Sequence, residues 1–490
     1  MKFFCAFQVA ATFSLLVAEV TALLGNLDRT AIDPSNDTFY DMPDDVSGFS
    51  LGEIIKSRQA PGSVQGISHY SKAYQLIYRT TDSFGNAASA ITTVVVPPNA
   101  THDKLLSYQI AEDASYIGCA PSYYVQTSDV EEGILRALEE GWYVNIPDYE
   151  GPQSAFTAGH LAGRLVLDSL RAALQSNNIT GLESNATVAL WGYSGGSLAT
   201  GWAAELQPWY APDLNIAGAA VGGFVVNITA VVLNVNNSTG SGFIASGISG
   251  LGNEYPAFQK VINESLVPNT SATFTRTEDQ CLTADLLTFL GQDIFSYFKQ
   301  GIAILDEPTV KNVTSNQTMG ETTPIIPLYV YQSVDDEIAP YQNVDDTVAG
   351  YCSDGATVEY MKSNNNSHTA EADRGGPYAF DWIKSRLAGS SVKIGCATST
   401  IVFSTDWDGK NTLTSTASGN ASASATSAGV SASSGVSASG TAHGPAGVSS
   451  TSASAATATQ TSGNSSSSSL ISVQSFLLVA LAILATMCNI

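Results

Sequence analysis

Between residues 74 and 387, short apolar runs typical of strands alternate with longer segments in which apolar residues recur at helical spacing. This pattern predicts alternating strands and helices. Short apolar runs at 74–80 and 88–96 predict a hairpin whose turn covers residues 83–86. Further strands are predicted at 104–110, 142–147, 188–192, 216–221, 325–332 and 357–362, and helices at 130–140, 158–175, 197–206 and 369–387. This alternation predicts an α/β fold, with a mostly parallel central sheet covered by helices on both faces.

Residues 224–315 break this rhythm with Gly-rich turns, short amphipathic pieces and several glycosylation sequons. We interpret this segment as a cap inserted above the sheet. Together with the flanking elements it predicts one α/β domain over residues 23–409, which is long enough to bury a substantial core.

The first 22 residues have the organisation of a secretory signal peptide. Lys2 precedes an apolar run at 3–17, and small residues follow up to Ala22, where we expect cleavage. The alternative, a buried N-terminal helix, leaves Lys2 and the small residues unexplained.

The C-terminal segment contains no Asp, Glu, Lys or Arg between residues 411 and 490. Residues 410–464 are mostly Ser, Thr, Ala and Gly, which predicts an unfolded, O-glycosylated stalk. Residues 465–490 begin with a Ser spacer and turn apolar from Leu470, a pattern typical of a GPI-attachment signal. Asn464 is the preferred attachment residue, with Gly463 and Ser465 as neighbouring candidates.

A single membrane-spanning helix is the alternative for residues 470–490. Such helices usually carry Lys or Arg on the cytoplasmic flank, and none is present here. We therefore predict an extracellular protein at the cell surface, attached through GPI to the outer membrane leaflet or the cell wall.

The formal net charge is −24 and lies before the stalk. This acidity argues against a nucleic-acid partner and against electrostatic docking on anionic lipid. We expect a soluble extracellular monomer.

Four cysteines remain once the terminal segments at 1–22 and 465–490 are removed, namely Cys119, Cys281, Cys352 and Cys396. An even number in an exported chain predicts disulfides. Three pairings are possible, and we favour Cys119–Cys281 with Cys352–Cys396. No CxxC or HExxH spacing occurs, so neither a metal site nor a cofactor is expected. Sequons suit a glycosylated surface protein and include Asn36, Asn99, Asn178, Asn185, Asn263 and Asn312.

The strongest chemical signal is Gly-Tyr-Ser-Gly-Gly at 192–196, between a predicted strand and a predicted helix. Gly192 and Gly196 remove side chains where strand and helix crowd together, and the sharp turn exposes the hydroxyl of Ser194. The context favours a nucleophilic serine over an ordinary tight turn.

A nucleophilic serine needs a base, and this fold orders its residues as Ser, then Asp or Glu, then His. Elimination leaves His368, because His69, His102 and His160 precede Ser194 and His443 lies in the stalk. His368 is predicted to lie on the polar loop that begins with residues 363–367, just after a predicted strand and before a predicted helix.

The acid is expected at the end of the strand over 325–332. Asp335, Asp336 and Glu337 follow that strand, and spacing alone does not choose among them. Asp345 and Asp346 are more distant alternatives.

Residues 31–397 resemble the fungal secretory lipases. The resemblance is carried by Gly-Tyr-Ser-Gly-Gly at 192–196, Tyr-Ala-Pro-Asp-Leu-Asn-Ile at 210–216, Asp-Glu-Ile-Ala-Pro-Tyr at 336–341, His-Thr-Ala-Glu at 368–371, and 113–122, which ends in Cys-Ala-Pro-Ser. The family usually has Glu-His where this chain has Ser367-His368. The resemblance implies Asp336 as the acid, and an oxyanion hole formed by Gly195 and Asp113.

The resemblance further implies a lipase or carboxylesterase that hydrolyses fatty esters such as triacylglycerols through an acyl-enzyme. Related scaffolds also host acyltransferases and peptidases. A second alternative is an inert surface protein that uses a hydrolase-like domain for adhesion.

Overall fold

The computed structural model describes residues 31–403, with gaps at 44, 63, 65–71 and 129. The predicted signal peptide, stalk, GPI signal and attachment residue Asn464 lie outside the described residues. Among the helices in the described part, none is both long and apolar enough to cross a bilayer.

A ten-stranded sheet forms the centre of the domain, in the order β1-β2-β3-β5-β4-β6-β7-β8-β9-β10. The first three strands, β1 (Ile54–Gln59), β2 (Lys72–Thr81) and β3 (Ala87–Val96), pair antiparallel. Strand β3 also pairs antiparallel with β5. The remaining strands run parallel to one another: β4 (Lys104–Gln109), β5 (Tyr143–Pro147), β6 (Thr187–Tyr193), β7 (Ile216–Gly222), β8 (Leu328–Ser333), β9 (Val358–Asn364) and β10 (Cys396–Val402). The mostly parallel α/β sheet predicted from the sequence is confirmed.

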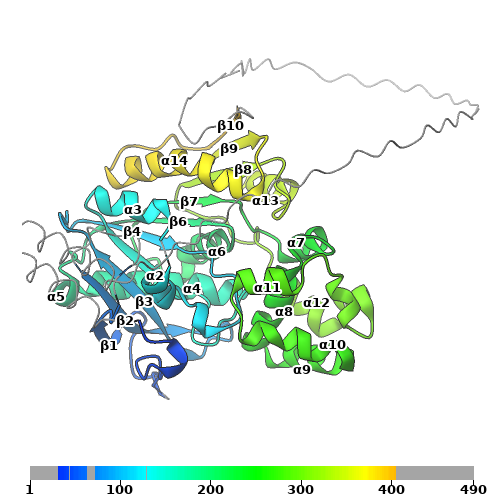
Figure 1. The fold of residues 1–490 in the computed structure, drawn as a ribbon. Coiled ribbons are helices and arrows are strands. Elements are labelled where there is room, and N and C mark those ends of the chain that lie inside the picture. Colours follow the sequence, from blue (N-terminus) through cyan, green and yellow to red (C-terminus); the bar gives the residue numbers. More distant parts are fainter. Residues whose placement is uncertain (1–30, 44, 63, 65–71, 129, 404–490) are drawn as a thin grey trace, which may run out of the picture. The chain divides into compact units, whose positions relative to one another are not determined.

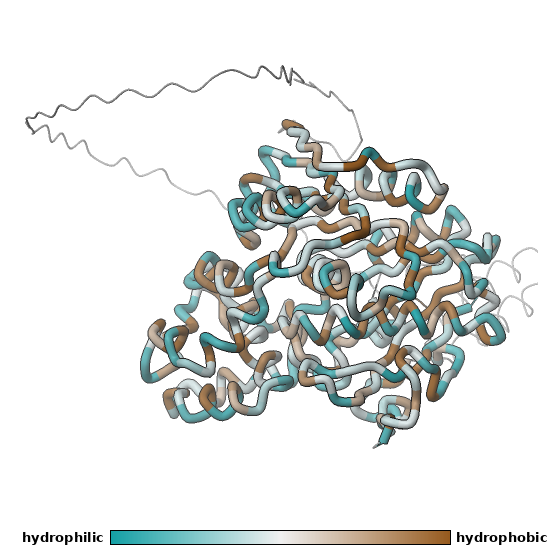
Figure 2. The backbone as a smooth tube through the Cα atoms, turned by 180° about the vertical axis from the view of Figure 1, so that it is seen from behind, coloured by the Kyte–Doolittle hydropathy of each residue, from teal (hydrophilic) through white to brown (hydrophobic). Residues whose placement is uncertain are grey.

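Helices cover both faces of the sheet because its central strands are buried on both sides. Hydrophobic stretches of the backbone, brown in Figure 2, run through the middle of the domain. One apolar cluster joins the sheet to α4 (Gly159–Gln175), α6 (Gly195–Tyr210) and α13 (Tyr341–Ser353). A second joins the opposite face to α2 (Pro121–Thr127), α3 (Glu132–Glu139) and α14 (His368–Leu387). Three short elements complete this part: η1 (Pro34–Asn36), η2 (Ile117–Cys119) and α5 (Asn177–Thr180).

The segment between β7 and β8 is helical and contains no named strand in its described residues (green in Figure 1). Its elements are α7 (Ile228–Val235), α8 (Ser241–Glu254), α9 (Pro256–Ser265), α10 (Pro268–Phe274), η3 (Thr275–Glu278), α11 (Leu282–Thr288), η4 (Ile294–Tyr297), η5 (Gly301–Asp306) and α12 (Pro308–Ser315). Apolar side chains of this helical insertion, such as Phe258 and Ile262, belong to the same cluster as α4 and α6.

Two disulfides link distant parts of the chain, and both match the favoured pairing. Cys119 pairs with Cys281 across a Cα–Cα distance of 5.6 Å, which ties η2 to the helical insertion. Cys352 pairs with Cys396 across 5.9 Å and ties α13 to the start of β10.

Several predicted boundaries were wrong. The strand expected from residue 325 begins at Leu328, because Pro327 lacks the N–H that a sheet ladder needs. Strands β1 and β10 were not predicted, since both lie at sheet edges and show little apolar alternation. Helix α13 was also missed, because its buried positions are few.

Candidate active site

Ser194 lies at the sharp turn between β6 and α6. Its backbone has φ 54° and ψ −124°, a conformation that costs free energy for a residue with a Cβ. The turn needs its flanking glycines: a Cβ on Gly192 would lie 2.1 Å from the carbonyl oxygen of Gly196, and one on Gly196 would lie 1.9 Å from that of Gln109. The strand–turn–helix context expected for this motif is therefore present.

The imidazole of His368 contacts the hydroxyl of Ser194. The Nε2–Oγ distance is 2.8 Å, so Ser194 can donate its proton to Nε2. His368 is the first residue of α14 rather than part of the preceding loop, and Ser367 caps this helix by accepting from the N–H of Ala370. The hydroxyl of Tyr193 donates to the carbonyl oxygen of His368 at 2.5 Å and holds its backbone beside the turn.

Asp336 is the carboxylate that contacts the imidazole. Its oxygens lie 2.8 and 2.9 Å from Nδ1 of His368, and both side chains are buried, with 8% and 6% of their residues exposed. The N–H groups of Ile338 and Ala339 donate to Oδ1, and Nε2 of Gln332 donates to Oδ2. These donors orient the carboxylate toward Nδ1–H.

The neighbouring acids take other partners. Asp335 accepts from the N–H of Asn365, and Glu337 accepts from the N–H of His368 at 2.8 Å. Asp345 pairs with Lys362, and Asp346 lies with it in α13.

Asp113 lies opposite the turn, in the loop after β4. It is 3% exposed and has a φ of 51°. A Cβ on Gly195 would lie 1.8 Å from Oδ1 of Asp113, so this carboxyl lies directly over the backbone of Gly195. Burial raises the pKa of Asp113 to about 7, although the nearby His368 acts in the opposite direction. The carboxyl can therefore carry a proton near neutral pH.

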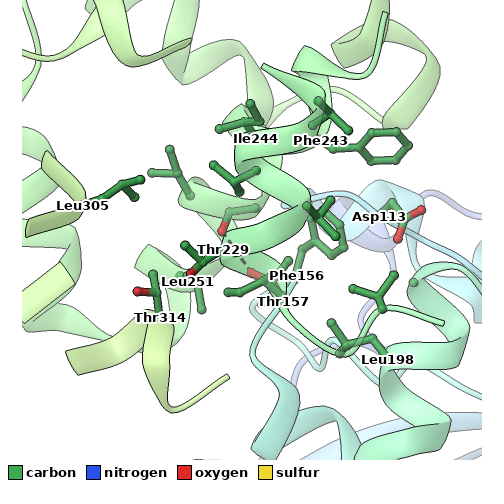
Figure 3. A pocket seen from close by; sticks show the side chains of 18 of the residues that line it. Asp113, Phe156, Thr157, Leu198, Thr229, Phe243, Ile244, Leu251, Leu305 and Thr314 are labelled. Atoms are coloured by element: carbon green, nitrogen blue, oxygen red, sulfur yellow. Dashed lines mark hydrogen bonds between the residues drawn. The ribbon is translucent and has the colours of Figure 1, made fainter. Parts of the chain in front are cut away.

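An apolar pocket opens from Ser194, Gly195 and Asp113 into the helical insertion. Figure 3 shows Asp113 and Leu198 at one side and Leu305 and Thr314 at the other. Its walls are mostly aliphatic and aromatic, and include Phe156, Val225, Ile228, Val232, Phe243, Ile244, Leu251, Phe258, Ile262 and Val310.

Comparison with known proteins identifies the family. The model of the family described as secretory lipase matches residues 122–395. Lipase A of Arthroderma benhamiae is 40% identical over 389 residues, covering 76% of this chain and 83% of that protein. Lipase 4 of Candida albicans is 39% identical over 385 residues, covering 74% of this chain and 83% of that protein. The chain belongs to the secretory lipase family.

The fold of this secretory lipase is similar to that of a solved relative. The X-ray structure of Candida antarctica lipase A is 30% identical, with a TM-score of 0.71, and covers 76% of this chain and 91% of that one. The same protein in its closed state gives a TM-score of 0.69 at 31% identity. The family and its relatives make the chain a secreted serine ester hydrolase of the lipase and esterase class.

Several residues around the site were not identified from the sequence of the secretory lipase. Gln332 lies within a buried strand and looked like an ordinary strand residue, yet it donates to Asp336. Tyr193 and Glu337 lie inside conspicuous motifs but gave no sign that both hold the backbone of His368. Only the fold brings these partners together.

Proposed function

We propose that Ser194, His368 and Asp336 form the catalytic triad with which this secretory lipase hydrolyses fatty esters. The observation that carries the proposal is the hydrogen-bonded chain from Asp336 through His368 to Ser194, which ends at the mouth of an apolar pocket. This geometry matches the requirements for an activated serine nucleophile.

In the acylation step, Oγ of Ser194 attacks the ester carbonyl carbon while Nε2 of His368 takes the hydroxyl proton. Asp336 accepts the Nδ1–H bond and stabilises the imidazolium that forms. The tetrahedral oxyanion lies beside the N–H of Gly195 and the carboxyl of Asp113. A protonated Asp113 would donate to the oxyanion from the side opposite the turn. His368 then gives its proton to the leaving alcohol.

In the deacylation step, His368 takes a proton from water, and the resulting hydroxide attacks the acyl carbon. Collapse of the second tetrahedral intermediate returns the proton to Ser194 and releases the carboxylic acid. Apart from water, both steps use only side chains and backbone groups of the protein.

The apolar pocket supports a fatty acyl group as the part of the substrate that is bound. Its walls come largely from the helical insertion, which we propose acts as a cap that holds the acyl chain. The relatives described above are named lipases, which favours triacylglycerols among the possible fatty esters. Turnover of p-nitrophenyl esters of increasing chain length, beside an emulsified triglyceride, tests this point. A preference confined to short soluble esters would identify an esterase instead.

A serine-directed fluorophosphonate probe tests the triad. We expect the wild-type protein to be labelled at Ser194, and Ser194→Ala to fold and be exported without label or esterase activity. The loss of turnover should reach several orders of magnitude. Turnover by the purified, folded variant would refute the assignment.

We further propose that the mature protein is glycosylated and held at the cell surface by GPI. Six sequon asparagines are exposed in the structure: Asn36, Asn99, Asn178, Asn185, Asn263 and Asn312. The anchor is supported by the small residues around Asn464, the Ser spacer and the apolar run that follows. Phosphatidylinositol-specific phospholipase C should release the protein from membranes. Retention after verified digestion would contradict the anchor.

A further inference from the structure

Glu371 is a fully buried carboxylate behind the proposed triad. It lies in the first turn of α14, three residues after His368, and is 0% exposed. A carboxylate in such a place is costly unless hydrogen bonds compensate for lost hydration. None of the steps described above uses it.

The hydrogen bonds of Glu371 go to the end of β9 and to the loop that precedes His368. Its Oε2 accepts from the hydroxyl of Ser363 and from Nδ2 of Asn366. Both partners are buried, at 0% and 1% exposure. One carboxylate oxygen therefore ties both sides of the β9–α14 loop to the helix that begins with His368.

The same loop is fastened to the end of β8, which leads into the loop carrying Asp336. The hydroxyl of Ser333 donates to the carbonyl oxygen of Asn366 at 2.7 Å, and the N–H of Val334 donates to that of Ser363 at 2.9 Å. Between them Asn365 adopts a φ of 65°. The loop conformation that places His368 is thus fixed by side-chain hydrogen bonds together with a backbone bond outside the strand ladder.

We propose that Glu371 is a positioning residue, which holds the β9–α14 loop so that the imidazole of His368 stays aligned between Asp336 and Ser194. The proposal rests on the proposed function and deepens it. The geometry to be protected is the pair of contacts at Nδ1 and Nε2, each 2.8–2.9 Å long. A displacement of about 1 Å at such a site costs roughly 100-fold in rate.

The electrostatic surroundings agree with a role close to the triad. Burial raises the pKa of Glu371 to about 7, the hydrogen bonds from Ser363 and Asn366 lower it, Asp336 raises it and Arg374 lowers it. The negative charge of Glu371 contributes to raising the pKa values of five tyrosines on the elements packed around it. These are Tyr193, Tyr329, Tyr331, Tyr360 and Tyr378.

The test compares Glu371→Ala and Glu371→Gln with Asp373→Ala in the full-length protein. Asp373 is an exposed acid on the same helix and serves as the matched control. The measurements are kcat and KM on p-nitrophenyl butyrate, the rate of fluorophosphonate labelling and the unfolding temperature. We expect Glu371→Ala to lower kcat and the labelling rate together by about 10- to 100-fold with KM within about twofold. Glu371→Gln should recover most of this loss, because its carbonyl oxygen can accept both hydrogen bonds, and Asp373→Ala should match the wild type.

A purely structural role predicts a different result. Glu371→Ala would then lower the unfolding temperature and leave kcat and the labelling rate unchanged, which would overturn the proposal. If Glu371→Ala does not fold, Ser363→Ala and Asn366→Ala remove one donor each, and normal kcat in both would also overturn it. Failure of the wild-type protein to label at Ser194 would instead refute the proposed function, so the two failures are distinguishable.

Discussion

Oδ1 of Asp113 occupies the space that a side chain on Gly195 would need, only 1.8 Å from the ideal Cβ position. The carboxyl and the backbone of Gly195 therefore form one surface beside Ser194. Within the described residues, Oδ1 of Asp113 has no hydrogen-bond partner. A buried, unpaired oxygen beside the backbone of Gly195 fits the proposed role of a donor that finds its partner only when an oxyanion forms.

The first prediction concerns the pH dependence of this group. Because burial raises the pKa of Asp113 to about 7, the carboxyl is a donor below that pH and loses its proton above it. We expect kcat/KM of the wild type to fall as pH rises through about 7, and Asp113→Asn to lack this fall because an amide stays a donor. Asp113→Ala should lose about 100-fold relative to the wild type below pH 7 and less above it, where the wild type has lost the same donor. An unchanged alkaline fall in Asp113→Asn would contradict a donor role for this side chain.

The second prediction separates Asp336 from its neighbour. Asp336→Asn cannot accept Nδ1–H in the same way and leaves His368 in the wrong tautomer, so kcat should drop by about 10⁴-fold. Asp335→Asn is the matched control, since Asp335 contacts the N–H of Asn365 and not the imidazole. It should lose less than about tenfold. Steady-state kinetics on one soluble ester is sufficient, and equal losses in both variants would refute the assignment of Asp336.

The third prediction concerns acyl-chain length. Leu305 lines the pocket on the side away from Asp113 (Figure 3), so Leu305→Trp should shorten the space for the chain. Turnover of long-chain p-nitrophenyl esters should fall by about 10-fold or more relative to short ones, since several methylenes lose their contacts. Ile302→Trp is the control, because Ile302 is 56% exposed in the same 3-10 helix. An identical chain-length profile for both variants would exclude acyl binding in this part of the pocket.

The fourth prediction concerns stability. Burial raises the pKa values of Glu112, Asp113, Asp148 and Glu150, and those of Asp113 and Asp148 reach about 7. A folded pKa above the unfolded value means that the folded state keeps its proton at higher pH. The stability linked to Asp113 and Asp148 is therefore complete below about pH 4 and is lost as pH rises to about 7, and Glu112 and Glu150 act in the same direction.

Differential scanning calorimetry between pH 4 and 8 should show an unfolding temperature that falls by several degrees. Asp148→Asn should reduce this slope, because the amide keeps its contacts with Ser122 without a charge. Asp103→Asn, at an exposed position, should not. An unfolding temperature that rises over this range would contradict the prediction.

The sheet and the proposed triad could be predicted because both depend on local signals. Apolar runs mark strands buried on both faces, and the turn at Ser194 needs glycines at fixed offsets. His368 followed from chain order and elimination, and its imidazole does contact Ser194. The choice among Asp335, Asp336 and Glu337 required either the family resemblance or the structure, since all three lie on one loop.

The parts that escaped prediction depend on contacts between distant residues. Glu371 read as an ordinary acid in the first turn of a helix, and its partners Ser363 and Asn366 read as polar loop residues. The role of Gln332 could not be predicted from the sequence, because its side chain reaches Asp336 and Ala339 only when the loop after β8 folds back over the strand. The edge strands lack the periodicity that reveals central strands.

Strand β10 has a mechanical consequence. It is the last named strand of the described chain, it pairs with β9 alone, and Cys396 at its first residue is bonded to Cys352 in α13. Tension applied to the chain beyond residue 403 would load β10 from its C-terminal end. Separation would begin at Val402 and Phe403, which contact Asn364 and Asn365 just before His368, and could proceed back to Cys396, where the disulfide passes the force to α13. A pull on the chain after β10 would therefore act first on the residues that lead to His368, and the disulfide would limit how far the strand can separate.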